Sequence, residues 1–257
     1  MIKIKHSNFE AIILKQGAQL VSFNLNGQEY LWSTEFKYYQ KNIPFRGGIP
    51  ICWPWFGKYD KLNHGFARII DWNLINTTYL SKEVIISFEL VYNEDTLKMW
   101  NHKFKLTLDI NLSDDGIKLL LNIKTDISTS GAFHTYYNTE DISKSYITGL
   151  NKDYKNLINN NLMYNSPKDL YINGELDRIY TNSNDEVKLY SINSITTINN
   201  YNHGDIVVWN PGIEKSKQMT DIKNGEYKKF VCIETARITK KFKNNDFIKL
   251  EIYKENK

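Results

Sequence analysis

Residues 103–112 read KFKLTLDINL, a stretch in which every second side chain is apolar. The turn residues SDDG follow at 113–116, and the alternation then resumes over 117–127. Because successive side chains of a strand point to opposite faces, this pattern predicts a β-hairpin with one buried face. In the second half of the hairpin, the residues expected to point inward are Ile117, Leu119, Leu121, Ile123 and Ile127.

Short strand-like segments recur along the rest of the chain, and convincing helices are nearly absent. The best helix candidate is a turn or two over 214–219, and the Asn-rich segment 150–175 is expected to be a surface excursion with room for one edge strand. Many short strands with little helix between them favour an antiparallel all-β sandwich over a βαβ sheet. No stretch has the composition of a linker, so we expect a single domain over 1–257. The further expected strands are 2–5, 10–15, 18–25, 83–91, 186–191, 194–199, 205–209, 229–234 and 247–253.

Charge and composition narrow the class of protein. The chain has 33 basic and 29 acidic residues, and no basic block of the kind that binds nucleic acid. Cys52 and Cys232 lack metal-site spacing and are expected to be reduced, buried thiols. The chain begins with the strand-like MIKIKH, and no apolar run is long enough to cross a bilayer. We therefore expect a cytoplasmic protein with neither a nucleic-acid nor a membrane partner.

Two glycine-rich motifs carry arginines that could point into a cleft. The first, PFRGGIPICWPWFG at 44–57, has the proline and glycine content of a rigid loop and contains Arg46. The second, HGFAR at 64–68, places His64 and Arg68 on either side of small residues. The alternative for the first motif is a tight corner with a surface arginine and core tryptophans, and the alternative for the second is a structural histidine.

Three further segments present acid–base or hydrogen-bonding groups. His134 lies in FHTYY at 133–137, and its unperturbed pKa is close to neutrality. Glu234 lies in VCIETA at 231–236, where apolar neighbours would desolvate the carboxyl group, raise its pKa and make it a better base. Asp177 lies in GELDRIY at 174–180 and suits hydrogen bonding to sugar hydroxyls. A packed histidine, a lysine-paired glutamate and a salt-bridged turn remain the structural alternatives.

Arginine is rare in a chain whose usual cation is lysine. Only four occur, Arg46, Arg68, Arg178 and Arg237, and two of them lie in the glycine-rich motifs. A guanidinium offers paired N–H donors that match a phosphate. The two arginines are therefore candidates for a site that needs a planar, bidentate guanidinium.

In their order and local sequence, these motifs resemble those of the hexose-6-phosphate mutarotases, a branch of the aldose 1-epimerase family. VVWNP at 207–211 followed by Glu214-Lys215 resembles this branch as well. The resemblance spans nearly the whole chain and implies a galactose-mutarotase-like β-supersandwich with an open cleft on one sheet. The sequence departs from the pattern of the family after Glu234, where Thr235-Ala236-Arg237 replaces the usual turn. Arg237 is therefore either a surface charge or, if the strand ends early, part of the site.

The resemblance also implies roles for individual residues. His134 would be the general acid and Glu234 the general base, while His64 and Asp177 would hold ring hydroxyls. Arg46 and Arg68 would line the site, and one or both would take the phosphate.

The implied activity is that of an isomerase that interconverts the α and β anomers of an aldohexose 6-phosphate, most simply glucose 6-phosphate. Ring opening removes a proton from the C1 hydroxyl and delivers one to the ring oxygen. The reaction requires no cofactor, and the chain has no metal-ligand cluster, phosphate-binding glycine loop or serine nucleophile motif. The expected partner is a small sugar phosphate, and the expected assembly is a monomer or weak homodimer. The aromatic residues proposed for the walls of the cleft are Trp53, Trp55, Tyr136 and Trp209.

Three other functions remain open from the sequence. A mutarotase for unphosphorylated aldoses would keep the same acid and base, but the arginine motifs at 44–57 and 64–68 favour a phosphorylated substrate. A glycoside hydrolase or lyase could use Asp177 and Glu234 as facing carboxylates, but His134 would then have no task. A non-catalytic carbohydrate-binding sandwich is the third, because a fold does not fix a function.

Overall fold

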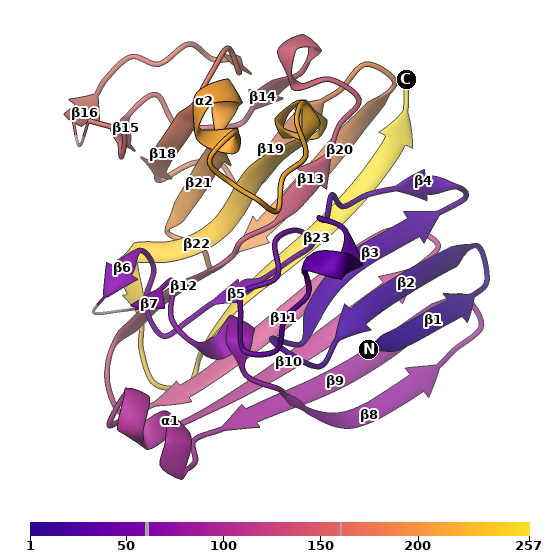
Figure 1. Cartoon of the computed structure of the whole chain (residues 1–257), viewed down its shortest axis with the longest axis vertical. Helices are drawn as coiled ribbons and strands as arrows, with labels where there is room; N and C mark the ends of the chain where they lie inside the picture. The colour runs from indigo at the N-terminus through magenta and orange to yellow at the C-terminus, as the bar shows by residue number, and fades with distance from the viewer. Residues whose placement is uncertain (60–61, 160) are drawn as a thin grey trace.

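The computed structural model of the chain describes residues 1–59, 62–159 and 161–257, and antiparallel sheets dominate it (Figure 1). The largest sheet has nine strands in the order β17-β14-β19-β20-β23-β11-β10-β9-β8. Their bounds, in the same order, are Leu170–Tyr171, Tyr146–Thr148, Glu186–Tyr190, Ser194–Tyr201, Asp246–Asn256, Gly116–Thr125, Phe104–Ser113, Glu83–Val91 and Asn73–Tyr79.

A second sheet carries most of the residues singled out above. Its eight strands follow the order β16-β15-β18-β21-β22-β12-β5, and β13 also pairs with β22. The bounds of these strands are Asn161–Met163, Tyr154–Asn156, Leu176–Thr181, Asp205–Asn210, Phe230–Phe242, Thr129–Phe133, Ile51–Cys52 and, for β13, Tyr136–Asn138.

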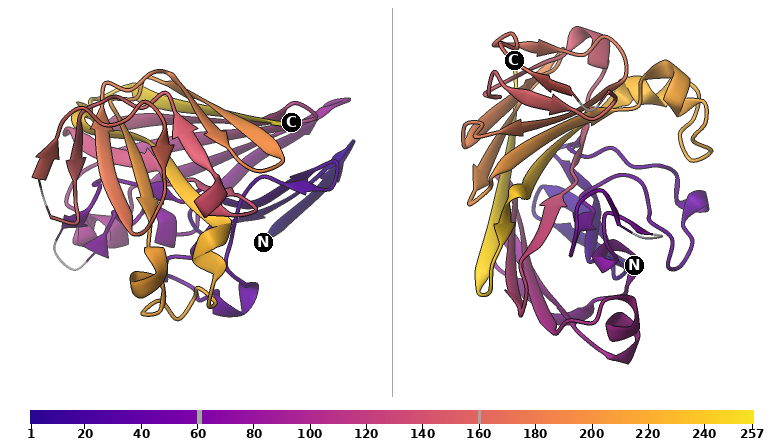
Figure 2. Two further views of the ribbon diagram at one scale, coloured as in Figure 1. Left: turned by 90° about the horizontal axis from the view of Figure 1, so that it is seen from above. Right: turned by 90° about the vertical axis from the view of Figure 1, so that its left-hand side faces the viewer.

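The N-terminal strands form a sheet of their own, in the order β1-β2-β3-β4. Figure 2 shows these strands lying across from the long strands of the nine-stranded sheet. Their inward side chains join one continuous apolar core with those of the larger sheets. Burial of so much apolar surface is the main term that stabilises the sandwich. The strand bounds are Ile2–His6, Phe9–Leu14, Gln19–Leu25 and Gln28–Glu29, and a separate pair is formed by β6 (Lys58–Tyr59) and β7 (Leu62–Asn63).

The predicted hairpin over 103–127 is β10 and β11, which pair in register from Phe104–Thr125 to Ser113–Gly116. Its alternating apolar side chains are buried as expected. Ile127 is the exception, because its side chain is 42% exposed and the prediction that it points inward was wrong. The strand ends at Thr125, whose hydroxyl donates to the carbonyl of Ile127 at 3.1 Å, so the chain turns before the alternation reaches this residue.

The small elements differ more from the predictions. Helix α1 (Glu94–Met99) was not predicted, although Asn93 and Thr96 form a capping box at its start. Helix α2 (Gly212–Ser216) lies near the predicted position, and the chain continues from it into a loop. The segment 150–175 contains three short strands, β15, β16 and β17, where one was expected. None of the helices in the described part of the chain is long and apolar enough to span a bilayer.

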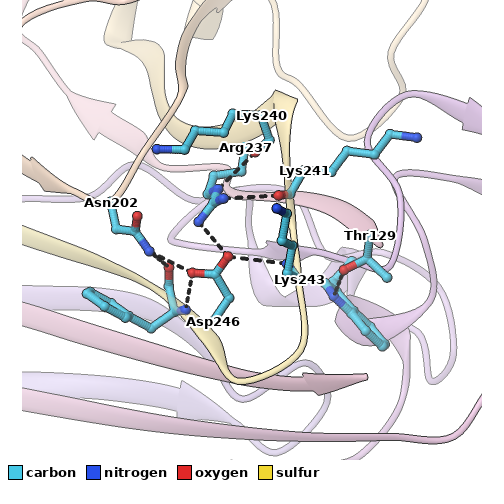
Figure 3. Close-up of polar contacts among 9 residues, drawn as sticks. Thr129, Asn202, Arg237, Lys240, Lys241, Lys243 and Asp246 are labelled. Carbon is cyan, nitrogen blue, oxygen red and sulfur yellow. Dashed lines mark hydrogen bonds and ion pairs between the residues drawn. The ribbon is translucent and has the colours of Figure 1, made fainter. Parts of the chain in front are cut away.

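Arg237 takes neither of the two places expected for it. Strand β22 continues through it to Phe242, and the arginine is buried, with 3% of its surface exposed. Its guanidinium donates to the carbonyls of Lys240 and Lys241 at 2.8 and 3.0 Å and pairs with Asp246 at 2.8 Å (Figure 3). Arg237 therefore stabilises the connection between β22 and β23, and it does not line the cleft described next.

Candidate active site

A cleft of about 750 Å³ opens over the eight-stranded sheet, and all six predicted site residues line it: Arg46, His64, Arg68, His134, Asp177 and Glu234. The sheet supplies the last three of these, from the break between β12 and β13, from β18 and from β22. The loops around the two glycine-rich motifs supply the first three. Residues within the segments 38–57, 63–68 and 215–221 also line the cleft.

The strand register fixes the two carboxylates. Strand β21 runs between β18 and β22, and on it Trp209 is paired with Asp177 while Val207 is paired with Glu234. Both carboxyl groups consequently reach the same cleft. His134 comes from the break between β12 and β13, where its N–H donates to the carbonyl of Pro50 at 2.9 Å.

His134 and Glu234 are in direct contact at the floor of the cleft. The His134 Nε2 atom lies 3.3 Å from Glu234 Oε1, and the two side chains are 10% and 1% exposed. Neither His134 Nδ1 nor Glu234 Oε2 has a hydrogen-bond partner among the described residues. Burial, reinforced by Asp177, raises the pKa of Glu234 well above its usual range. Burial also lowers the pKa of His134, and the charge of Arg68 lowers it further. Both shifts favour the uncharged form of the pair, with the proton on the carboxyl group.

The environment of His64 fixes its tautomer. Its Nδ1 accepts a hydrogen bond from the backbone N–H of Gly57 at 3.2 Å, so in the neutral ring the proton lies on Nε2. Burial, with help from the charge of Arg68, lowers its pKa to about 3. Close backbone approach explains the adjacent glycine, because a Cβ at Gly65 would lie 2.0 Å from the carbonyl oxygen of Trp53. His64 thus presents a neutral N–H donor at the cleft.

Asp177 keeps its carboxylate without a hydrogen-bond partner among the described residues. Burial is the main cause that raises its pKa to about 6, against the opposing charge of Lys215 and with a contribution from Glu175. Lys215 itself lies at the edge of the cleft and pairs with Glu175 at 2.8 Å. An unengaged carboxylate at a cleft wall is suited to accept hydrogen bonds from hydroxyl groups.

The two cleft arginines are held differently. Arg46 donates from Nε to Asp221 Oδ2 at 2.8 Å, and its Nη1 lies 3.5 Å from the hydroxyl of Tyr136. Burial opposes its charge, but Tyr136 and Asp221 outweigh burial and raise the pKa of Arg46. Arg68 donates from Nη2 to the carbonyl of Asn63 at 2.6 Å, and its position near His134 and Glu234 adds positive charge to the floor.

Two of the four proposed aromatic residues line the cleft. Tyr136 and Trp209 do so, and the Tyr136 ring stacks on His134 with centroids 4.9 Å apart. Trp53 is fully buried in the core, and Trp55 packs against the core and donates to the carbonyl of Leu62 at 3.2 Å. The prediction that Trp53 and Trp55 line the walls of the cleft was wrong, because the rigid loop directs their indole rings toward the core.

Several lining residues were missed from the sequence, notably Lys215, Gln218, Thr220 and Asp221. They follow the VVWNP motif on α2 and the loop after it, where the polar residues have no pattern that separates them from an ordinary surface loop. Across the described residues, no group of three or more His, Cys, Asp or Glu side chains is arranged to hold a metal ion. The two thiols, Cys52 and Cys232, are buried and unpaired with each other, as expected.

An antiparallel β-supersandwich with a polar, open cleft on one sheet defines the galactose-mutarotase-like class of proteins. The chain belongs to the aldose 1-epimerase family, whose sequence profile matches residues 1–248, and it is accordingly an isomerase. A protein of Escherichia coli named "Putative glucose-6-phosphate 1-epimerase" is 32% identical over 256 residues, which cover 92% of this chain and 82% of that protein.

Solved structures agree with this assignment. A mutarotase-like protein from Salmonella typhimurium superposes with a TM-score of 0.95 at 27% identity, covering 99% of this chain and 90% of that one. A galactose mutarotase-like protein from Lactobacillus casei gives a TM-score of 0.76 at 19% identity, covering 99% and 100% of the two chains. The second comparison establishes the common fold.

Proposed function

We propose that the protein interconverts the α and β anomers of an aldohexose 6-phosphate, with glucose 6-phosphate as the first candidate. The observation that carries the proposal is the contact between His134 Nε2 and Glu234 Oε1 at the floor of a cleft that also holds two arginines. Relatives from three bacteria and a plant, each named "Putative glucose-6-phosphate 1-epimerase", support the same substrate class.

The acid–base step uses the two adjacent groups together. Ring opening takes a proton from the hydroxyl on C1 and gives one to the ring oxygen, and both oxygens are bonded to C1. Neighbouring acid and base groups can therefore reach both oxygens from one side of the anomeric carbon. Glu234 accepts the C1 hydroxyl proton, His134 donates to the ring oxygen, the C1–C2 bond rotates in the aldehyde, and closure runs the two transfers in reverse.

The proton between the two groups must first move. In the cleft without substrate it rests on Glu234, because burial disfavours both charged forms. The 3.3 Å contact allows direct transfer to His134 Nε2. His134 Nδ1 and Glu234 Oε2 have no partner among the described residues and are free to bond to sugar hydroxyls. Such hydrogen bonds would stabilise the charged forms of the two groups, which the reaction needs.

The position of Arg46 supports a phosphate on C6. In a pyranose, C6 is attached to C5, the neighbour of the ring oxygen, so the phosphate lies on the side of the ring that faces the acid. Tyr136 stacks on His134, and Arg46 Nη1 lies 3.5 Å from the hydroxyl of Tyr136. Arg46 is therefore separated from the acid, His134, by the ring of Tyr136. From this position its guanidinium can donate a pair of N–H groups to phosphate oxygens. Arg68, also in the cleft, contributes positive charge to the same substrate.

The remaining predicted residues suit the ring hydroxyls. His64 offers a neutral Nε2–H donor and Asp177 an acceptor without a protein partner among the described residues. Tyr136 and Trp209 give the cleft apolar surface for the C–H face of the sugar.

Exchange spectroscopy by NMR tests the proposal. The rate of anomer exchange would be measured for glucose 6-phosphate with wild-type protein and with the Glu234→Gln and His134→Asn variants. Acceleration by the wild type that each variant reduces by about 10²-fold or more supports the acid and the base. Binding of the sugar phosphate without any acceleration would contradict the proposal and leave a binding module.

A further inference from the structure

The carboxylate of Asp221 forms an ion pair with Arg46 in the cleft. Oδ2 of Asp221 accepts from Arg46 Nε at 2.8 Å, and each of the two side chains is 25% exposed. Asp221 lies in the loop that follows α2, and 175 residues of chain separate the partners. In both views of Figure 2, this loop and the N-terminal segment around 36–38 project on the same side of the sheets.

Thr34 joins the two segments. Its backbone N–H donates to the carbonyl of Arg46 at 3.0 Å, and its hydroxyl donates to the backbone carbonyl of Asp221. The same side chain and backbone therefore fix the position of both partners of the ion pair.

Buried Gln19 fixes the backbone on either side of Arg46. Its amide donates to the carbonyls of Phe45 at 3.1 Å and Gly47 at 2.7 Å, and only 1% of its surface is exposed. The backbone of Arg46 is thus fixed independently of Asp221, and the aspartate acts on the guanidinium alone.

The bond to Nε determines which edge of the guanidinium faces substrate. A guanidinium has five N–H donors in a planar fork, and Asp221 engages the one on Nε. Nη1 is directed to the region of Tyr136, inside the cleft. With the Nε side occupied, the two Nη groups remain for an anion in the cleft.

From this arrangement we propose that Asp221 is a positioning residue that sets specificity for the phosphorylated sugar, because it holds Arg46 with its Nη edge toward the phosphate. The inference rests on the proposed function and deepens it. Asp221 acts through Arg46 and has no hydrogen bond or ion pair with His134 or Glu234 in the described structure, so its loss weakens recognition of the phosphate and leaves the chemical step intact. A pre-oriented side chain binds more tightly because less freedom is lost on binding.

The alternative role for Asp221 predicts the opposite sign. If the carboxylate only competed with the phosphate for Arg46, its removal would free the arginine and strengthen binding. The direction in which KM moves therefore separates a positioning residue from a competitor.

The test compares Asp221→Ala and Asp221→Asn with wild-type protein, using glucose 6-phosphate and glucose as substrates. We expect Asp221→Ala to raise KM for glucose 6-phosphate about tenfold, with kcat within about twofold, and to change kcat/KM for glucose much less than kcat/KM for glucose 6-phosphate. Asp221→Asn keeps an oxygen that can accept from Nε and should lie closer to the wild type. Inhibition of glucose turnover by inorganic phosphate should weaken in parallel in Asp221→Ala.

Lys223→Ala supplies the matched control. Lys223 lies in the same loop and pairs with Glu35 on the exposed surface, so its loss loosens the loop without touching Arg46. This variant should keep the wild-type KM. A lower or unchanged KM for glucose 6-phosphate in Asp221→Ala, or an equal rise in Lys223→Ala, would overturn the inference. Wild-type protein that shows no preference for the phosphorylated sugar would instead contradict the proposed function itself.

Discussion

Asp177 and Glu234 flank one strand: the first is paired with Trp209 and the second with Val207, two residues apart on β21. The register of three strands thus brings two carboxyl groups into a single cleft, where each is exposed to little water. Asp177 contributes to the raised pKa of Glu234, after burial. Like charges placed together in this way cost stability and keep the base protonated until substrate arrives.

The replacement Asp177→Asn should stabilise the protein at neutral pH. The pKa of Asp177 rises from 3.8 to about 6 on folding, so between these values the folded state binds more protons than the unfolded state. Wild-type stability therefore falls as the pH rises from about 4 to about 6, and the loss is complete at pH 7. After a discount for partial exposure, we expect the variant to gain about 1–2 kcal/mol at pH 7 and little at pH 3.5. Urea unfolding at both pH values measures this, and a difference that does not change with pH would contradict it.

Replacing either the acid or the base should cause nearly the same loss of activity as replacing both. Glu234→Gln and His134→Asn are each expected to reduce kcat/KM by about 10²–10⁴-fold. Because the two groups share one proton across 3.3 Å, kcat/KM of the double variant should be only slightly lower than that of the less active single variant. The exchange rates of the four proteins measure the coupling. Losses that multiply in the double variant would show two independent groups.

His64 should stay neutral throughout the working range of pH. Its pKa of about 3 in the folded state lies below the value of 6.5 for a free histidine. Its contribution to stability is therefore present above pH 6.5 and is lost as the pH falls toward 3. Long-range ¹H–¹⁵N spectra should show a proton on Nε2 and no titration between pH 5 and 8. A midpoint near 6.5 would contradict the assignment.

The buried pair of Arg237 and Asp246 should matter for stability and leave the chemistry unchanged. Arg237→Ala removes the ion pair with Asp246 and the donors to the carbonyls of Lys240 and Lys241, and should lower the free energy of unfolding by about 1–3 kcal/mol. The folded variant should keep the wild-type kcat/KM, because Arg237 lies outside the cleft. Lys5→Ala removes an exposed pair with Glu10 and serves as the control, with no measurable change in stability. A selective loss of activity in Arg237→Ala would place it in the site after all.

The alternation of apolar and polar residues predicted the long strands, because every second side chain of a strand points to the buried face of the sheet. It failed at Ile127, where the chain turns through the hydroxyl of Thr125, and it missed α1, whose capping box at Asn93 is a weak signal in a short helix. The motifs predicted six residues that meet in one cleft. Asp221 could not be predicted, because its role depends on Arg46, 175 residues away, and on a loop with no local pattern.

The most direct test of the account compares glucose 6-phosphate with glucose as substrates of the wild-type protein. Anomer exchange of both sugars would be followed by two-dimensional NMR at low temperature, with a trace of protein and with none. The account predicts a much higher kcat/KM for glucose 6-phosphate, lowered selectively when Arg46 is replaced by methionine. Equal acceleration of both sugars would keep the acid–base chemistry and contradict the recognition of phosphate by the cleft.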